Sequence, residues 1–425
     1  MKALLFIMVL FGISTMTAQS EQIERDIENI EEKIIEWRRY FHKHPELSNR
    51  EFNTAGKIAG HLKSLGLDVQ TGIAKTGVVA VLKGKKPGKV VALRADIDAL
   101  PVTERTGIPF KSEVTTTYLG KETGVMHACG HDTHIAIMMG VAEVLSKNND
   151  FAGTVKFIFQ PAEEGAPPGE EGGAELMVKE GVLKSPDVDA IFGLHIGSYL
   201  NVGQIIYKPG GIMAAAQRFV IKVKGIQAHG SSPWNGVDPI LAASKIVDGL
   251  QTIISREMKL TEEAAVITIG KISGGVRNNI IPEEVELIGT IRTLDYDMQK
   301  ILNQRMKEMV LAIAKAYRAE ATIEIASGLP ITYNDPELTA RIIPSLQKAA
   351  GKENVNLTKA VTGAEDFSFF QKEVPGFYFF LGGKPVDLPS EKTTQHHTPD
   401  FYIDESGLLL GVRSFINIVY DYLGT

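Results

Sequence analysis

The sequence predicts an α/β protein with a second, α+β domain inserted into the chain. In the first half of the chain, runs with strand character alternate with runs of helical periodicity, which is typical of a sheet flanked by helices. From about residue 214 the order changes to β-α-β-β-α-β, the order of a ferredoxin-like unit. The length of 425 residues and the hydrophobic content of 44% provide material for two or three domains.

The chain begins with a segment that has the form of a secretory signal peptide. Lys2 precedes the apolar residues 4–13, and small and polar residues follow. Because the apolar stretch is short for a bilayer span, residues 1–20 are predicted to be removed, with cleavage near 18–20. The alternative is an uncleaved membrane anchor. The signal peptide predicts a periplasmic or secreted protein, and no later stretch favours stable membrane insertion of the mature chain.

Residues 21–213 form the first part of the larger domain. Their periodicity predicts three helices, at 21–40, 54–65 and 135–146. Short apolar runs predict two strands, at 78–82 and 90–94, with the turn-forming Lys86-Pro87-Gly88 between them. His61, in the second helix, is expected to be an ordinary surface side chain.

Residues 214–328 are predicted to be the inserted domain. Its strand, helix, strand, strand, helix and strand are expected at 217–224, 238–257, 264–273, 284–293, 296–317 and 321–326. Gly328-Leu329-Pro330 ends this unit. Residues 329–425 then return to the larger domain.

Charge and cysteine content exclude several classes of function. The formal net charge is −6 and no stripe rich in lysine and arginine is present, so we expect no nucleic-acid partner. The single cysteine excludes intrachain disulfides.

That cysteine, Cys129, lies in a short segment rich in histidine. The run 125–134 also holds His127, His131 and His134, and Gly130 interrupts it. Thiolate and imidazole are ligands that a borderline-soft divalent ion such as zinc accepts. The segment therefore has the composition of half a metal site.

Compatible partners occur at three further places. Glu163 and Glu164 follow an apolar, strand-like run, His195 ends another, and His396 and His397 lie near the C-terminus. In open α/β sheets the carboxyl ends of parallel strands face one crevice, so these groups can converge. The sequence therefore predicts a shared metal site.

Each group also has an ordinary interpretation. His195 alone could be a hydrogen-bonded core residue, Cys129 a small buried apolar side chain, and the paired glutamates a solvated loop. Their conjunction favours the metal site, because six of the ten histidines and the only cysteine lie in these few segments.

Several ordered motifs resemble one family. The sequence from residue 34 onward is similar to the amidohydrolase branch of the dinuclear metallopeptidases, which includes hippurate hydrolases, N-acyl-amino-acid amidohydrolases and plant indoleacetyl-amino-acid hydrolases. The resemblance implies a zinc-peptidase-like catalytic domain with a mixed sheet flanked by helices, and an inserted domain that acts as a lid and in dimerisation. The motifs that carry it are 94–101, 126–134, 160–165, 194–195, 363–367 and 397–399.

The resemblance implies two divalent metal ions per subunit. Zinc is expected, and manganese, cobalt or nickel fit the ligand chemistry nearly as well. Cys129 is the candidate bridge between the ions, since coordination removes the thiol proton. Related peptidases carry a histidine where this chain has Asp96, so His131 is expected to compensate. The implied ligands are Cys129, His131, Glu164, His195 and His397.

The family pattern also assigns other roles. Glu163 is the expected general base toward a water molecule, and Asp98 is expected to orient a ligand. His229 is the expected donor to the oxyanion. Asn279 and Arg292 are expected to contact the carboxylate of the substrate. For Arg292 an ordinary strand-end salt bridge is the alternative.

The expected activity is hydrolysis of the amide bond of N-acyl or N-aroyl amino acids by a homodimer. One alternative is a dipeptidase or aminoacylase with a different substrate preference. Another is a non-catalytic metal- or ligand-binding protein, which would not require Glu163.

Overall fold

The computed structural model describes residues 20–424, which form two units. The first comprises residues up to 208 together with 334–358 and the chain from 369 onward, and the second comprises 209–333 and 359–368. The second unit takes in the predicted inserted domain and also residues 359–368, which the sequence assigns to the larger domain. The predicted signal peptide falls almost wholly outside the described residues.

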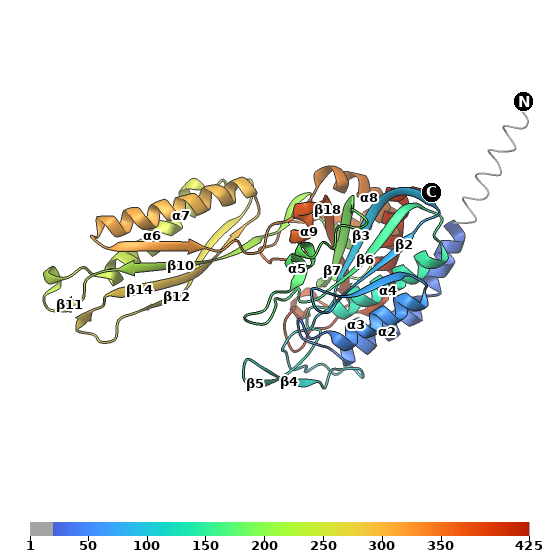
Figure 1. The fold of residues 1–425 in the computed structure, drawn as a ribbon, viewed down its shortest axis with the longest axis horizontal. Coiled ribbons are helices and arrows are strands. Elements are labelled where there is room, and N and C mark those ends of the chain that lie inside the picture. The colour runs from blue at the N-terminus through green and yellow to red at the C-terminus, as the bar shows by residue number, and fades with distance from the viewer. Residues whose placement is uncertain (1–19, 425) are drawn as a thin grey trace, which may run out of the picture. The chain divides into compact units, whose positions relative to one another are not determined.

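The first unit contains a mixed eight-stranded sheet (Figure 1). Its four central strands, β6, β3, β7 and β18, are parallel, whereas β1 with β2, β2 with β6, and β18 with β8 pair antiparallel. In spatial order the strands are β1 (Asp68–Ile73), β2 (Gly77–Lys83), β6 (Ala152–Gln160), β3 (Lys86–Asp96), β7 (Ala190–Asn201), β18 (Gly376–Lys384), β8 (Ile205–Tyr207) and β17 (Val355–Leu357).

Helices cover this sheet, which confirms the predicted α/β class. Helices α4 and α10 pack on β3, α2 packs on α4, and α8 packs on α10. In α4 nearly every residue is buried, including Ile135, Met138 and Val141 at 0% exposure, so its first residue, His131, is held by a rigid element. The helices are α2 (Glu31–Lys43), α3 (Phe52–Ser64), α4 (His131–Lys147), α5 (Gly173–Lys179), α8 (Pro336–Ala350), α9 (Ser368–Glu373) and α10 (Leu408–Leu423).

Two local predictions for this unit are wrong. The single helix expected over 21–40 is interrupted by a turn at residues 29–30, because Ile27, Ile30 and Ile34 are all buried and the turn brings both helical segments onto the core. His61 is half-buried rather than an ordinary surface residue, since its ring lies 4.6 Å from that of Trp37.

The second unit has the predicted ferredoxin-like order. Its antiparallel sheet runs β12-β14-β10-β15, and β10 alternates buried and more exposed residues, as expected when α6 and α7 cover one face (Figure 1). Asp238 and Asp295 begin the two helices by accepting backbone N–H groups. The elements are β10 (Ala215–Lys224), α6 (Pro239–Glu257), β12 (Ala265–Gly274), β14 (Glu284–Thr293), α7 (Tyr296–Ala316) and β15 (Glu320–Ile325).

Both units also contain short strand pairs. The first unit has a hairpin of β4 (Thr115–Tyr118) and β5 (Lys121–Gly124). The other pairs are β11 (Ala228–His229) with β13 (Ile280–Ile281), and β9 (Gly210–Met213) with β16 (Thr332–Asn334).

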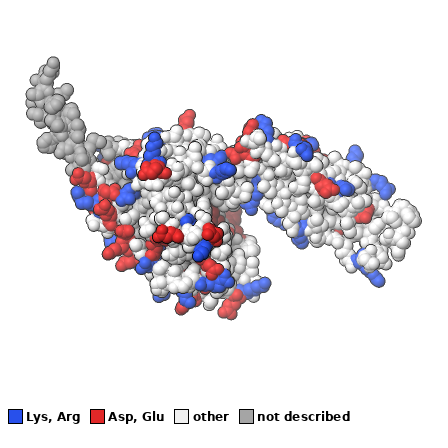
Figure 2. Space-filling view, turned by 180° about the vertical axis from the view of Figure 1, so that it is seen from behind, with Lys and Arg blue, Asp and Glu red and all other residues white. Residues whose placement is uncertain are grey.

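The charge distribution on the surface and the character of the helices are in line with the amino-acid composition. On the face shown in Figure 2, basic and acidic side chains are interspersed. Over residues 20–424 no helix combines the length and apolar character needed to cross a membrane.

Candidate metal centre

The candidate site of the first unit is built where its central strands end. Strand β3 ends at Asp96, β6 ends just before the segment with Glu163 and Glu164, and β7 carries His195. Because β6, β3 and β7 are parallel, these positions lie toward the same edge of the sheet. His131 begins α4 beside them.

Gly130 makes the turn between Cys129 and His131. Its φ of +92° is a left-handed conformation that favours glycine. A Cβ atom at this position would lie only 2.4 Å from Cγ2 of Ile196 on β7, so a larger residue would push the helix away from the strand. The glycine therefore lets the thiol and the first imidazole of α4 approach the sheet together.

Cys129 is the centre of the cluster. Its Sγ lies 3.3 Å from Nε2 of His195 and 3.3 Å from Nε2 of His397. The same nitrogen of His397 is 3.1 Å from Oε1 of Glu164. Ligand atoms of Cys129, His131 and His195 form one compact group, and those of Cys129, Glu164 and His397 form a second. The sulfur belongs to both groups, as an atom bridging two ions would.

Two of the imidazoles are oriented by main-chain carbonyls. Nδ1 of His131 donates to the carbonyl oxygen of Asp98 at 2.9 Å, and Nδ1 of His195 donates to that of Ile196 at 2.7 Å. Because Nδ1 of each ring is engaged, Nε2 is the atom left to bind a cation once any proton on it is released. Nε2 of His131 is buried without a hydrogen-bond partner among the described residues, which is costly unless a ligand satisfies it.

His134 has a structural role instead. Its Nδ1 donates to Oδ1 of Asp96 at 2.5 Å, and its Nε2 accepts the N–H of Ile196 at 2.9 Å. Asp96 in turn accepts from Arg94 at 2.7 Å. Because both ring nitrogens are engaged, His134 has no lone pair for a metal, although it lies close to His131 and Asp96.

His396 is a further member that the sequence-based assignment leaves without a role. Its Nδ1 lies 3.7 Å from Sγ of Cys129, and its Nε2 accepts the N–H of Ser198. Burial lowers the pKa of His396 to about 3, so the ring is neutral beside the sulfur. The clustering of histidines placed His396 among the candidate partners, but the sequence could not indicate its contact with the sulfur.

The protonation of the cluster shows a need for positive charge. Burial and the carboxylates of Glu164 and Glu163 raise the pKa of the Cys129 thiol well above its usual value. Burial opposes the charged form of His131, but the carboxylates of Asp96 and Asp98 outweigh it and raise the pKa to about 10. Protons thus neutralise the cluster where divalent cations would otherwise do so. One thiol, one carboxylate and three imidazoles suit a divalent transition metal.

Asp98 connects two of the candidate ligands. Its Oδ2 accepts from Oγ of Ser48 at 2.7 Å and from the N–H of Glu164 at 3.1 Å, and its Oδ1 lies 3.3 Å from Nδ1 of His131. Glu163 is half-buried, with Oε2 at 3.8 Å from Nε2 of His131. Its carboxylate therefore lies beside the cluster.

The other three predicted site residues belong to the second unit. His229 and Asn279 lie close to each other, since the N–H of Gly230 donates to the carbonyl oxygen of Asn279, and His229 pairs in β11 with Ile280, the residue after Asn279. His229 is held by Ser231, whose N–H and hydroxyl both contact its Nδ1. Arg292 lies in β14 and makes no ion pair with the described residues. The roles of these three residues stay predictions.

Comparison with known proteins shows the family. Residues 92–421 match the sequence profile of peptidase family M20/M25/M40. The chain belongs to this family. An M20 structure from Bacillus subtilis, described as a dinuclear metal-binding peptidase, is 34% identical with a TM-score of 0.77, over 93% of this chain and 99% of the other.

Two relatives of known name share most of their length with this M20 chain. N-acetyl-L-cysteine deacetylase of Bacillus subtilis is 36% identical over 399 residues, which cover 94% of this chain and 90% of the relative. Thermostable carboxypeptidase 2 of Saccharolobus solfataricus is 40% identical over 397 residues, which cover 92% and 95%. The protein is a metal-dependent amidohydrolase of the M20 family, as the motifs indicate.

Proposed function

We propose that this M20 amidohydrolase cleaves the amide bond of N-acyl or N-aroyl amino acids and releases a carboxylic acid and a free amino acid. The convergence of Cys129, His131, Glu164, His195 and His397, with Glu163 beside them, is the observation that carries the proposal. The relative named as an N-acetyl-L-cysteine deacetylase supports this substrate class.

We propose two divalent ions per subunit, held by these five side chains with Cys129 between them. Zinc fits the donor set best, and manganese, cobalt or nickel are the other candidates. When bound, such ions polarise an amide carbonyl and lower the pKa of a water molecule toward neutrality.

Glu163 is the proposed general base. Its carboxylate takes a proton from the attacking water as the new C–O bond forms, and returns that proton to the amine nitrogen as the C–N bond breaks. Glu164 cannot take this part, since its Oε1 contacts His397 within the proposed ligand set. Asp98 holds His131 and the backbone of Glu164 in place for the step.

The second unit supplies the remaining proposed contacts as a lid. His229 is the proposed donor to the oxyanion, and Asn279 and Arg292 are proposed to bind the carboxylate of the amino acid. Arginine suits that group because its planar fork pairs with both carboxylate oxygens.

Substitution of the proposed base tests the function. Glu163→Gln keeps the size of the side chain but removes the basic oxygen, so we expect kcat to fall by about 10³-fold or more while bound metal is unchanged. Metal content by elemental analysis and acid release from N-acetyl and N-benzoyl amino acids are the two measurements. Retained turnover would contradict the assignment of Glu163, and lost metal would place it among the ligands.

A peptidase is the second candidate, because one relative is named a carboxypeptidase. A dipeptidase must recognise a free α-ammonium group, whereas an acyl-amino-acid hydrolase need not. Hydrolysis of glycyl-glycine in preference to benzoyl-glycine would favour the dipeptidase. Absence of metal-dependent hydrolysis over a broad panel of acyl-amino acids would favour a binding protein.

We also propose that the protein is exported and dimeric. Residues 1–20 have the composition of a signal peptide, which predicts a periplasmic or secreted mature chain. Sequencing the amino terminus of the mature protein tests this, with a first residue near 19–21 as the expected result. An intact Met1 in the exported protein would favour an uncleaved anchor.

A further inference from the structure

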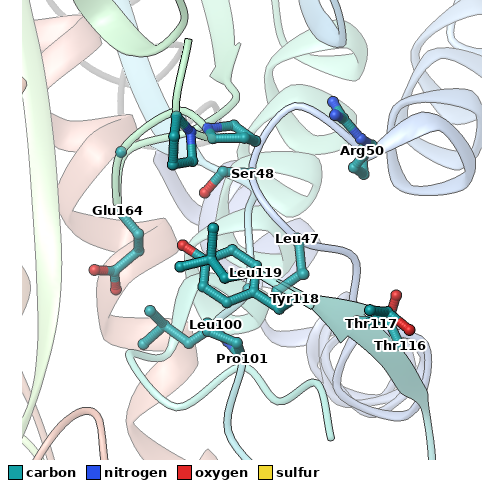
Figure 3. A pocket seen from close by; sticks show the side chains of 14 residues that line it. Leu47, Ser48, Arg50, Leu100, Pro101, Thr116, Thr117, Tyr118, Leu119 and Glu164 are labelled. Carbon is teal, nitrogen blue, oxygen red and sulfur yellow. The ribbon is translucent and has the colours of Figure 1, made fainter. Parts of the chain in front are cut away.

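A cavity of about 400 Å³ lies in the first unit beside Glu164. Figure 3 shows its apolar side chains grouped together, with the carboxylate of Glu164 to one side. Because Glu164 contacts His397 within the candidate metal centre, the cavity adjoins the proposed site of hydrolysis. The apolar part of its lining includes Leu47, Leu100, Pro101, Tyr118 and Leu119.

The cavity has little to offer a charged group. Among the described residues that line it, Arg50 is the one cation, and its guanidinium is 2.5 Å from Glu170, which also binds Lys75. Figure 3 shows the Arg50 side chain directed away from Leu119. The hydroxyl of Ser48 donates to Asp98. A carboxylate would therefore find no unpaired cation on these walls, whereas an apolar group would contact the leucine, proline and tyrosine side chains that lie beside the hydroxyls of Ser48, Thr116 and Thr117.

Leu119 is at the tip of the β4–β5 hairpin, where leucine is an unusual residue type. The two-residue turn of Leu119 and Gly120 has φ of +50° and +78°, a combination that favours Asn-Gly. A leucine in the left-handed region is uncommon, and this one is 68% exposed, so the folded core gains little from it. Its apolar side chain nevertheless lines the cavity.

We propose that this cavity binds the acyl group of the substrate and selects uncharged, apolar acyl groups larger than acetyl, with Leu119 as a specificity-determining residue. The proposal rests on the proposed function, since it presupposes an acyl-amino acid at the metal centre. An acetyl group would leave most of the cavity unfilled. A benzoyl or medium-length alkanoyl group would replace water in the cavity and contact the leucine and tyrosine side chains. Each added methylene should therefore raise kcat/KM by about fourfold.

The experiment compares acyl groups on one amino acid. The kcat/KM values for N-acetyl, N-butanoyl, N-hexanoyl and N-benzoyl alanine are measured on the wild-type metalloenzyme and on Leu119→Asn. Asparagine suits the turn better than leucine, so the variant should fold and bind metal at least as well. Its ratio of hexanoyl or benzoyl to acetyl kcat/KM should fall at least about fivefold. Tyr118→Ala should lower the ratio in the same direction.

Leu357→Asn is the matched control. Leu357 is also 68% exposed, belongs to the same unit and does not line the cavity, so its ratio should equal that of the wild type. If wild type hydrolyses these substrates but prefers acetyl, or if Leu119→Asn leaves the ratio unchanged, the acyl-site assignment is wrong and the proposed function stands. If wild type hydrolyses none of them, the proposed function itself fails.

Discussion

Glu51 is a buried carboxyl group behind the segment that carries Glu163 and Glu164. Its Oε1 accepts the N–H of Ala162 at 2.9 Å, and its Oε2 accepts the hydroxyl of Thr76 at 2.6 Å. Ala162 has a φ of +53°, a conformation that is rare for alanine. Glu51 therefore helps to hold a strained turn directly before the proposed base.

Stability should depend on pH through Glu51. Burial, and then the charge of Asp98, raise its pKa to about 7. Between about 4.5 and 7 the folded state binds a proton that the unfolded state has released, so the free energy of unfolding falls as pH rises. Glu51→Gln cannot ionise and should be more stable than wild type at pH 8, by at most about 3 kcal/mol, with a smaller difference at pH 5.

Urea denaturation at pH 5 and pH 8 measures this effect. Glu113→Gln is the control, because the Glu113 side chain is 82% exposed and should change stability equally little at both values. A stability difference for Glu51→Gln that does not grow with pH would show that the carboxyl group is ionised throughout.

The sequence predicts which residue types come together in the site, but not which of their atoms are available to bind a cation. His131 and His134 both lie in the first turn of α4 and close to each other, and only the hydrogen bonds distinguish them. The carbonyl of Asp98 takes one nitrogen of His131 and leaves the other open, whereas Asp96 and the N–H of Ile196 engage both nitrogens of His134. Such partners come from β3 and β7, distant in sequence, so no spacing rule could identify them.

Lys156 anchors one element of the first unit. It lies in β6 and is 2% exposed, and its Nζ donates to the carbonyl oxygens of Val182, Lys184 and Pro186 at 2.9, 2.7 and 3.0 Å. The segment that joins α5 to β7 is thus fastened to the sheet by one ammonium group. Burial lowers the pKa of Lys156 to about 8.

Loss of this group should loosen the segment. Lys156→Met keeps most of the unbranched side chain but leaves three carbonyl groups without their donor, so we expect a loss of about 3 kcal/mol in the free energy of unfolding. Hydrogen exchange should speed up in residues 180–188 before the rest of the unit. Lys184→Met, where the side chain is 73% exposed, should change neither quantity. Unchanged exchange in Lys156→Met would show that other contacts hold the segment.

Helices and strands with a clear hydrophobic periodicity were predictable from the sequence, whereas very short strands were not. The six elements of the second unit fall within a few residues of their expected positions, because α6 and α7 have clear apolar faces and β10 alternates. The three-residue strands β8 and β17 gave no pattern, since each forms by pairing with a distant partner. The turn at residues 29–30 was equally hidden, because isoleucine spacing continues across it.

At the scale of the whole molecule, the second unit has exposed apolar side chains that fit the proposed dimer. Ile226, Trp234, Ile272 and Val276 are 58%, 73%, 60% and 93% exposed. Large apolar side chains that are this exposed are candidates for an interface with another protein. Their place in the second unit agrees with dimerisation through the inserted domain.

Charge introduced at these positions should dissociate the dimer. We expect wild type to sediment as a dimer and the double variant Trp234→Glu, Val276→Glu to sediment as a monomer. Dimerisation of the variant would remove unpaired carboxylates from water, and this desolvation is unfavourable. Leu357→Glu, at an exposed leucine of the first unit, should leave the dimer intact. A monomeric wild type, or a double variant that stays dimeric, would contradict this placement.

The first unit is assembled from three separate stretches of chain, and the last one provides His397 and α10. While the carboxyl-terminal stretch is still within the ribosome, the nascent protein has four of the five proposed ligands and lacks the helix that packs on β3 and α4. The complete set of proposed ligands therefore exists only once the carboxyl-terminal stretch has left the ribosome. The proposed export would place uptake of cations after translocation, where the metal supply outside the cytoplasm would determine which ion the proposed site takes up.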